Sequence, residues 1–126
     1  MSPLRGIRGA VQAPADSPEA IHASTRALLR EMVDRNRVVA EDVVAIWFTQ
    51  TPDLTAAHAA TSARELGWRH VPLLGAQEAP VGGQMPRVVR ALMIAELDVN
   101  PTSVRHVYLG VTRELREDLN ETGACE

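Results

Sequence analysis

The sequence predicts an α/β domain in which a small sheet is covered by helices on one side. Along the 126 residues, short apolar runs typical of strands alternate with segments whose apolar residues recur at helical spacing. The resulting order is β-α-β-α-β-α-β, and such alternation is typical of a sheet with helices packed against it. Because this length suits one ordinary domain and 45% of the residues are hydrophobic, we expect residues 1–126 to form one domain with a modest core.

The first strand and the first helix are expected near the N-terminus. The strand covers Leu4 to Val11, and within it Arg8 has a glycine nearby on each side. These glycines leave open space around the long arginine side chain, although a bulge or a sheet edge would also explain them. The helix begins at Asp16-Ser17-Pro18, where Asp16 or Ser17 can act as the cap, and it runs to Asn36.

The middle of the chain is expected to hold two strands with a helix between them. The run from Val43 to Thr49 is continuously apolar and rich in β-branched and aromatic residues, which is typical of a strand buried on both faces. An alanine-rich helix follows from Ala57 to Leu66 and ends at Gly67. A third strand covers His70 to Leu74, and the segment from Ala76 to Gly83 is predicted to be a loop.

A third helix and a fourth strand complete the expected fold. Pro86 can open this helix, whose buried stripe consists of Val88, Val89, Leu92, Met93 and Leu97. The strand covers Val104 to Leu109, and a charged segment follows from Thr112 to Leu119. A sheet of four short strands with helices on one side leaves its other face bare, and a neighbouring subunit would be an economical cover.

The composition argues against several classes of function. The formal net charge is -3, whereas nucleic-acid-binding domains carry a basic surplus. No apolar run is long enough to span a bilayer, and no polybasic segment is present that would bind its surface. Cys125 is the single cysteine, so an intrachain disulfide cannot form. We therefore expect a cytoplasmic protein that binds neither nucleic acid nor membranes.

The sequence contains no standard catalytic motif and no metal-ligand spacing. Glycine-rich nucleotide-binding motifs, serine-hydrolase motifs and zinc-protease motifs are all missing. The four histidines, His22, His58, His70 and His106, lie on different expected elements. We therefore expect an activity that needs neither a metal nor a cofactor.

Arginines at unusual positions remain as candidates for chemistry. All 13 basic residues are arginine, whose planar fork suits carboxylates and phosphates. Arg87 and Arg90 are three residues apart and would share one face of the third helix. The other candidates are Arg8, Arg64, Arg116, Glu78 and Tyr108. Each of them alone is more often a solvated surface residue, so the residue types by themselves name no substrate.

Taken together, these residues resemble one known family. In chain order the matching segments are Arg5-Gly6-Ile7-Arg8-Gly9-Ala10, Thr51-Pro52-Asp53-Leu54, Ala63-Arg64-Glu65-Leu66-Gly67-Trp68, Val71-Pro72, Gln77-Glu78, Pro86-Arg87 with Arg90, Arg105-His106-Val107-Tyr108-Leu109, and Leu115-Arg116 with Asp118-Leu119. No single segment is specific, but in this order they cover nearly the whole chain. The sequence resembles the monofunctional chorismate mutases of the trimeric α/β type.

The resemblance implies a small mixed sheet flanked by helices, assembled as a homotrimer with a pseudo-α/β-barrel core and with active sites between subunits. It implies that one subunit supplies Arg8, Glu78, Arg90, Tyr108 and Leu115. The neighbouring subunit would supply His58, Ala60, Thr61 and Arg64, with Arg116 near the entrance. Leu73, Leu74 and Gly75 would line the pocket wall. The sequence departs from the family pattern at His58, Thr61, Leu74, Gly75 and Glu117.

The implied reaction is the rearrangement of chorismate to prephenate in aromatic amino-acid biosynthesis. One C–O bond breaks as a C–C bond forms, so the reaction needs no nucleophile and no proton transfer. The protein has to hold the reactive conformer and to stabilise the charge that grows on the ether oxygen. We expect Arg90 to donate to the ether oxygen and to a carboxylate. Arg8 and Tyr108 would hold the side-chain carboxylate, and Glu78 would accept from the ring hydroxyl. Arg64 and Arg116 would draw in the dianion.

Two other classes of function are compatible with the same residues. A trimer of similar fold could bind a carboxylate metabolite without rearranging it, or could hydrolyse an imine. A structural or interaction protein could carry the arginines as solvated charges, but this interpretation does not explain why Arg8 lies between glycines. Loss of chorismate with formation of prephenate would separate an enzyme from a binding module.

Overall fold

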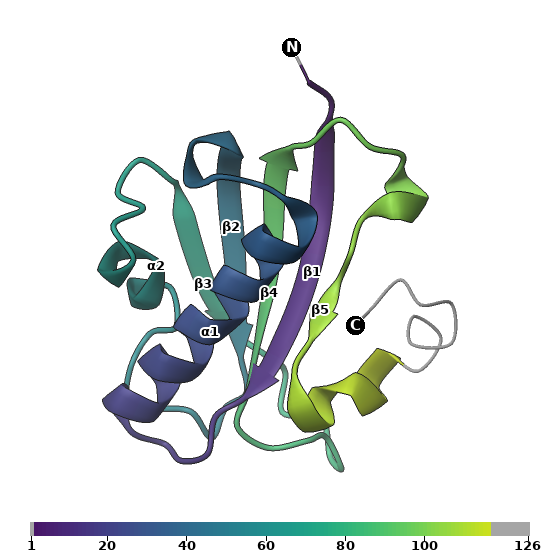
Figure 1. The fold of residues 1–126 in the computed structure, drawn as a ribbon. Coiled ribbons are helices and arrows are strands. Elements are labelled where there is room, and N and C mark those ends of the chain that lie inside the picture. The colour runs from purple at the N-terminus through teal and green to yellow at the C-terminus, as the bar shows by residue number, and fades with distance from the viewer. Residues whose placement is uncertain (1, 117–126) are drawn as a thin grey trace.

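A computed structural model of the protein describes residues 2–116 (Figure 1). Within this range one sheet contains five strands: β1 (Leu4–Gln12), β2 (Val43–Gln50), β3 (Leu73–Gln77), β4 (Val88–Glu96) and β5 (Val107–Tyr108). Helix α1 (Pro18–Asn36) crosses one face of the sheet, and the short helix α2 (Thr61–Glu65) lies on the same side. The short 3-10 helices are η1 (Ala40–Asp42), η2 (Pro101–Ser103) and η3 (Gly110–Arg116). The predicted architecture of a small mixed sheet flanked by helices is confirmed.

The strands follow the order β3-β2-β4-β1-β5 and form both parallel and antiparallel pairs. β4 occupies the centre, because it pairs antiparallel with β1 on one side and with β2 on the other. β3 is parallel to β2, and β5 is parallel to β1 at the opposite edge. Parallel neighbours need a crossover that passes over a face of the sheet, and α2 supplies the crossover from β2 to β3.

Helix α1 begins and ends at residues that satisfy its terminal backbone groups. The side chain of Ser17 accepts a hydrogen bond from the N–H of Ala20 at 3.1 Å, and Pro18 occupies the first turn. At the other end Arg37 adopts a left-handed conformation with φ of 55°, and its N–H bonds to carbonyls of the last turn. The predicted helix is confirmed, and Ser17 is the cap of the two that the sequence allows.

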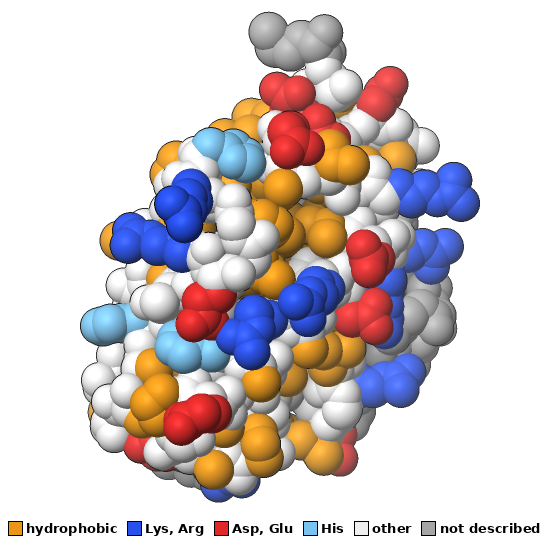
Figure 2. Space-filling view, turned by 60° about the vertical axis from the view of Figure 1, so that its left-hand side comes forward, with side chains coloured by type: hydrophobic (Ala, Val, Ile, Leu, Met, Phe, Trp, Pro, Cys, Tyr) orange, Lys and Arg blue, Asp and Glu red, His pale blue; other side chains and the backbone are white. Residues whose placement is uncertain are grey.

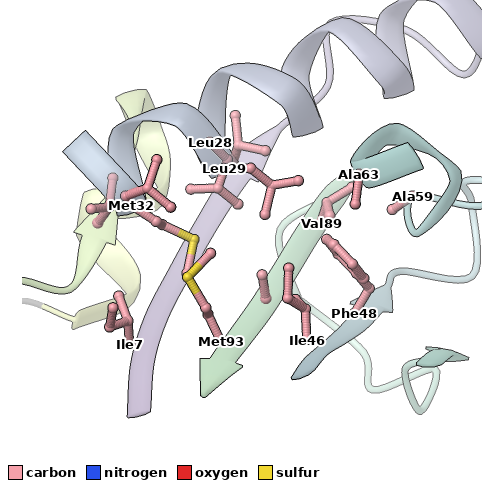
Figure 3. Close-up of a cluster of buried hydrophobic side chains, with 14 of the residues drawn as sticks. Ile7, Leu28, Leu29, Met32, Ile46, Phe48, Ala59, Ala63, Val89 and Met93 are labelled. Carbon is pink, nitrogen blue, oxygen red and sulfur yellow. The ribbon is translucent and has the colours of Figure 1, made fainter. Parts of the chain in front are cut away.

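The hydrophobic core lies between α1 and the sheet (Figure 3). Its fully buried side chains come from α1, β1, β2 and β4 and include Leu28, Met32, Ile7, Phe48 and Met93. Ala59, just before α2, and Ala63, within α2, extend this core over β2. Burial of these side chains holds α1 at a fixed place on the sheet, and the opposite face of the sheet is left free to carry other residues.

Gly9 has a packing role that differs from the one predicted. A Cβ at this position would lie 2.8 Å from Sδ of Met32 and 2.9 Å from Cδ1 of Leu28, so a larger residue would force these side chains of α1 to shift. Gly9 therefore faces α1, on the opposite side of the sheet from its neighbour Arg8. The alternative explanation by a bulge fails, because β1 pairs with β4 in unbroken register. An edge does not explain Gly9, which pairs with Val107 of β5 on the other side.

The helix predicted to start at Pro86 and to include Leu97 does not form, and this segment is the central strand β4. Alanine, leucine and methionine are good helix formers, and apolar residues on both faces of a buried strand imitate helical spacing. In the structure Val89, Ala91, Met93 and Ala95 alternate along β4 and are buried toward α1. Pairing with a strand on each side supplies two ladders of backbone hydrogen bonds, and this tertiary context overrides the local helix propensity.

The other predicted elements lie near their expected places but differ in length. α2 covers Thr61–Glu65 instead of Ala57–Leu66. β3 covers Leu73–Gln77 instead of His70 to Leu74, so it continues into the predicted loop. β5 contains two residues, whereas a strand from Val104 to Leu109 is predicted. The charged segment belongs to η3 as far as Arg116, and residues 117–119 lie outside the described part of the chain.

The face of the sheet opposite α1 carries exposed apolar side chains. Trp47, Leu74 and Leu92 are 45%, 60% and 38% exposed, respectively. The strand register places these three residues side by side, because Trp47 pairs with Leu74 on β3 and with Leu92 on β4. We call this the open face and these three residues the apolar row. The predicted bare face opposite the helices is therefore present in the single chain.

Candidate active site

The strand register places two of the predicted arginines diagonally on the open face. Arg8 of β1 pairs with Leu92 of β4, and Arg90 of β4 pairs with Ala10 of β1. Side chains two residues apart along a strand share a face, so both arginines point to the same side of the sheet. Diagonal neighbours on paired strands lie within reach of long side chains. On its other side Arg90 pairs with Thr49 of β2.

A cavity of about 280 Å³ lies over this part of the open face. We call it the arginine cavity, and its lining residues are Arg8, Gly9, Trp47, Thr49, Arg90, Ala91, Leu92 and Tyr108. These residues come from β1, β2, β4 and β5, which are separated in sequence and joined only by the sheet. The fold thus brings together three of the predicted site residues, Arg8, Arg90 and Tyr108.

Glu78 lies beside the arginine cavity, and its carboxylate accepts two hydrogen bonds. Its Oε2 accepts from Nε of Arg90 at 2.9 Å and from Oγ1 of Thr49 at 2.6 Å. The N–H of Glu78 donates to the carbonyl of Gln50 at 2.8 Å, just beyond the end of β3. The Glu78 side chain is only 14% exposed, whereas that of Arg90 is 39% exposed. The carboxylate therefore orients the guanidinium from within the protein and leaves the arginine accessible.

Tyr108 and Leu115 belong to a small apolar cluster next to the same cavity. Tyr108 is buried, and Leu115 packs partly buried against the cluster that contains it. Thr112 fastens η3 to β1, because its hydroxyl donates to the carbonyl of Ala10 at 3.0 Å and lies 2.6 Å from that of Leu109. Tyr108 and Leu115, which the resemblance assigns to the same subunit's part of the site as Arg90, thus belong to one cluster, of which Tyr108 lines the arginine cavity.

The backbone of Arg8 is fixed while its side chain is exposed. Its N–H donates to Nδ1 of His106 at 2.9 Å, immediately before the parallel pairing of β1 with β5 begins. The residue is exposed on the open face and lines the arginine cavity. A fixed backbone and an accessible guanidinium suit recognition of an anion.

A second cavity, of about 680 Å³, lies against α2 and β3. We call it the α2 cavity. Its lining residues include the four that the resemblance assigns to a neighbouring subunit and two of the predicted wall residues: His58, Ala60, Thr61 and Arg64, with Leu73 and Gly75. Leu74 is not among its lining residues and belongs to the apolar row instead. The two cavities share no lining residue, so each one contains a different part of the predicted site.

The loop between β2 and α2, which lines much of the α2 cavity, is held by a side-chain amide. The amide nitrogen of Gln50 donates to the carbonyls of Leu54 and Ala57, each at 3.0 Å. Its oxygen accepts from the N–H of Ala59 at 3.0 Å. Three bonds from one side chain give this irregular segment a defined shape.

Asp16, just before α1, ties the same loop to the helix. Its carboxylate accepts hydrogen bonds from the hydroxyl and the N–H of Thr55 and from the N–H of Ala56. The Thr55 hydroxyl has the largest effect and lowers the pKa of Asp16, the backbone N–H groups act in the same direction, and burial opposes them. The negative carboxylate is therefore the form that anchors the loop.

Known proteins match this chain over almost its whole length. The family model described as "Chorismate mutase type I" matches residues 4–119. The chain belongs to the type I chorismate mutase family. It is 48% identical over 117 residues to chorismate mutase AroH of Thermus thermophilus, covering 92% of this chain and 96% of that relative. It is 40% identical over 124 residues to chorismate mutase AroH of Bacillus subtilis (strain 168), covering 98% of each.

The fold also matches that of a solved family member. A structure of chorismate mutase from Clostridium thermocellum superposes with a TM-score of 0.84 at 34% identity, covering 86% of this chain and 97% of that chain. Together with the family model and the two relatives, this match confirms the predicted resemblance and the predicted activity. The chain is a chorismate mutase, and therefore an isomerase.

The structure contradicts one prediction about the arginines of this chorismate mutase, and the side chain of a second predicted arginine lies outside the described residues. Arg87 does not share a face with Arg90, because it precedes β4 and its Nε donates to the carbonyl of Ala13 at 2.9 Å. It is held just before the central strand begins, instead of facing the cavity. Arg116 is the last residue of η3, and its side chain lies outside the described part of the chain, as do Glu117 and Cys125.

Among the lining residues of the arginine cavity that sequence reasoning did not assign to the site are Trp47, Thr49 and Leu92. Trp47 and Thr49 are two residues apart on a strand that the sequence does predict, so strand alternation was the available signal. Leu92 was assigned to a buried helix stripe, and its place on the open face follows only when β4 is recognised as a strand. Thr49 is the most informative omission, because it bonds directly to Glu78.

The surface of this family member carries charges of both signs. On the side that bears α2 and β3, basic and acidic side chains are interspersed with apolar ones (Figure 2). Within residues 2–116, no three His, Cys, Asp or Glu side chains lie close enough to hold a metal ion. Over the same range, neither α1 nor another helix has the length and apolar character that a bilayer-spanning helix requires.

Proposed function

We propose that this chain, as a single catalytic domain, converts chorismate to prephenate in clefts between the subunits of a homotrimer. One observation carries the proposal: the two cavities of a single chain contain complementary halves of the predicted site. The arginine cavity contains Arg8, Arg90 and Tyr108, with Glu78 beside it. The other half lies in the α2 cavity, which shares no lining residue with the first. Apposition of these two cavities from neighbouring chains would complete the site.

The open face supports an assembly of this kind. The apolar row of Trp47, Leu74 and Leu92 is exposed on three neighbouring strands and lies next to the arginine cavity, which Trp47 and Leu92 also line. Contiguous exposed apolar side chains are typical of protein interaction sites. A subunit seated on this row would exclude water from the arginine cavity and so strengthen the electrostatic interactions inside it.

Arg90 is the residue to which we assign stabilisation of the transition state. Its Nε–H is bonded to Glu78, so the two Nη groups are the donors that can reach a substrate. As the C–O bond of chorismate breaks, negative charge grows on the ether oxygen. A fixed guanidinium at that atom favours the transition state over the resting substrate, which is the requirement for raising kcat.

The remaining residues hold the substrate in its reactive conformer. Arg8 and Tyr108 would bind the side-chain carboxylate from the other end of the same cavity. Because Oε2 of Glu78 already accepts from Arg90 and Thr49, we assign Oε1 to the ring hydroxyl. Contacts at the side-chain carboxylate and at the ring hydroxyl hold the side chain of the substrate over its ring. Such positioning lowers the entropic part of the activation barrier.

The α2 cavity would supply the outer part of the site. Arg64 is exposed there and is the permanent positive charge among its lining residues, with His58 close to it in sequence. Ala60, Thr61, Leu73 and Gly75 would form the wall, and Arg116 would act near the entrance. Attraction of a dianion by Arg64 and Arg116 would raise the rate of substrate entry. We place this activity in the cytoplasm, where a chain with a single cysteine needs no disulfide.

A complementation experiment tests whether each site is shared between subunits. Arg90→Ala and Arg64→Ala are each expected to abolish most chorismate turnover. The two inactive variants are co-expressed with different tags, and mixed trimers that carry both tags are purified. If Arg90 and Arg64 come from different chains, one of the three sites in each mixed trimer contains neither substitution, and turnover returns to roughly a third of the wild-type value.

The matched control mixes Arg90→Ala with Arg8→Ala, whose positions lie in the same cavity of one chain. Each site in that mixture contains one substitution or the other, so no activity should return. Sedimentation equilibrium of the wild-type protein gives the number of subunits. Equal failure of both mixtures to recover activity, or a monomeric active enzyme, would contradict the shared site. Absence of chorismate turnover in the wild-type protein would contradict the function itself.

A further inference from the structure

Arg87, at the start of β4, has a backbone conformation that its side chain disfavours. Its φ is 54°, and within residues 2–116 the only other non-glycine residue with positive φ is Arg37, at the end of α1. In the left-handed region a Cβ crowds the following carbonyl, so a residue other than glycine stays there only when its surroundings hold it. Arg87 is three residues before Arg90, and its conformation determines how the chain enters β4.

Asp53 and Thr51 are the residues that hold this conformation from the β2 side. Both carboxylate oxygens of Asp53 accept from the N–H of Arg87, at 3.2 and 3.0 Å, and Oδ1 also accepts from the hydroxyl of Thr51. Oγ1 of Thr51 in turn accepts from the N–H of Val88 at 3.0 Å. The N–H of Thr51 donates to the carbonyl of Val88 at 3.1 Å. Two consecutive residues at the start of β4 are therefore bonded to the segment that follows β2.

Arg87 is held equally firmly from the β1 side. Its carbonyl accepts from the N–H of Ala13 at 2.8 Å, and its Nε donates to the carbonyl of Ala13 at 2.9 Å. The strand that follows then pairs Arg90 with Ala10 on β1 and with Thr49 on β2. A slip of one residue in this register would turn Arg90 from the open face toward α1.

We propose that Asp53 is a positioning residue for Arg90. By holding Arg87 in the left-handed conformation, its carboxylate fixes the register of β4 and sets the guanidinium of Arg90 against Glu78. Asp53 lines neither cavity, so it acts through the backbone and not on the substrate. This inference rests on the proposed function, because it explains the placement of the residue to which that function assigns the developing charge.

The test combines the loss of the carboxylate with a glycine that needs no support. Asp53→Ala should lower kcat for chorismate by about 100-fold with a smaller change in KM, as expected when a catalytic group shifts by about 1 Å. Adding Arg87→Gly should restore much of kcat, because glycine adopts positive φ without a carboxylate to hold it. Asp53→Asn keeps an oxygen that can accept from the N–H of Arg87 and should lose less activity than Asp53→Ala.

Arg37→Gly provides the matched control for this rescue. It relieves a left-handed residue with nearly the same φ, 55°, at the end of α1 and away from both cavities. Added to Asp53→Ala, it should raise the melting temperature by relieving similar left-handed strain, without restoring kcat. If Arg37→Gly restores kcat as well as Arg87→Gly does, Asp53 contributes general stability only and the inference is wrong.

A spectroscopic readout keeps this inference separate from the proposed function. The Nε–H signal of Arg90, assigned by its loss in Arg90→Lys, should shift in Asp53→Ala and return toward the wild-type position when Arg87→Gly is added. An unchanged signal, or a kcat within about 10-fold of wild type in Asp53→Ala, would overturn the positioning role. Should the wild-type protein lack turnover, the proposed function fails, and the signal of Arg90 still decides whether Asp53 positions it.

Discussion

Replacement of Arg90 by lysine separates the charge at position 90 from the geometry of the guanidinium. In the structure one N–H of Arg90 is bonded to Glu78 at 2.9 Å, which leaves a planar group with further donors toward the cavity. The ammonium of lysine is a single point of charge on a flexible stem, so it cannot donate hydrogen bonds to Glu78 and to the substrate in a fixed geometry at the same time. We expect at least one charge-assisted donor to the transition state to be lost.

The expected magnitude follows from that loss. Removal of one donor to a developing oxyanion lowers kcat by about 10²–10³-fold, which corresponds to about 3–4 kcal/mol of transition-state stabilisation. Stability should change far less, because Arg90 is 39% exposed in its ion pair with Glu78. Exposed ion pairs contribute about 0–1 kcal/mol, so we expect a shift in melting temperature below about 4 °C. The variant should therefore be folded and nearly inactive.

The assay follows chorismate absorbance in initial-rate measurements on purified Arg90→Lys, with circular dichroism and thermal melting on the same samples. Arg35→Lys is the matched control, because Arg35 also forms a partly exposed ion pair, with Glu31 on α1, and lines neither cavity. Its kcat should equal that of the wild type. Turnover of Arg90→Lys within about 3-fold of wild type would show that the fork geometry is dispensable and would refute this reasoning.

Three further predictions concern loop anchoring, packing and assembly. The hydrogen bond from Thr55 lowers the pKa of Asp16 from 3.8, so the contribution of Asp16 to stability is complete above that pH and is lost as the pH falls through the lower folded value. Urea unfolding at several pH values should show a stability difference between wild type and Asp16→Ala near neutral pH that disappears in strong acid. A difference that is constant with pH would contradict this linkage. Gly9→Ala should destabilise the fold by about 1–3 kcal/mol in denaturant titration, because its Cβ would collide with Met32, and an unchanged midpoint would show that α1 can move aside. Trp47→Asp should shift sedimentation toward monomers while the circular dichroism spectrum stays that of the wild type, and intact trimers would show that the apolar row is not an interface.

The elements that sequence reasoning found are those with strong local signals. Ser17 and Pro18 mark the start of α1, and the helix runs as predicted to Asn36, after which Arg37 turns the chain. The continuous apolar run after Val43 is β2, a strand with a neighbour on each side. Capping residues and apolar periodicity act within a few residues of each other, so they can be read without knowledge of the fold.

β4 is the element that local signals could not provide. Its residues fit a helix by spacing and by propensity, and the strand forms because β1 and β2 pair with it from both sides. The mistake carried over to the site, since Arg87 and Arg90 were expected on one helix face and instead have different roles. Trp47 and Thr49 remained unnoticed for the same reason, because their neighbours across the sheet are residues of β4.

The amino-acid sequence already specifies which side chains are available for chemistry and, through a series of short matching segments, to which family the chain belongs. The tertiary structure alone decided which of those side chains meet: a central strand in one particular register sets Arg90 beside Thr49 and Glu78, diagonal to Arg8. The physical reason is that strand pairing joins residues that are distant along the chain. No periodicity within one segment records the identity or the register of its partner.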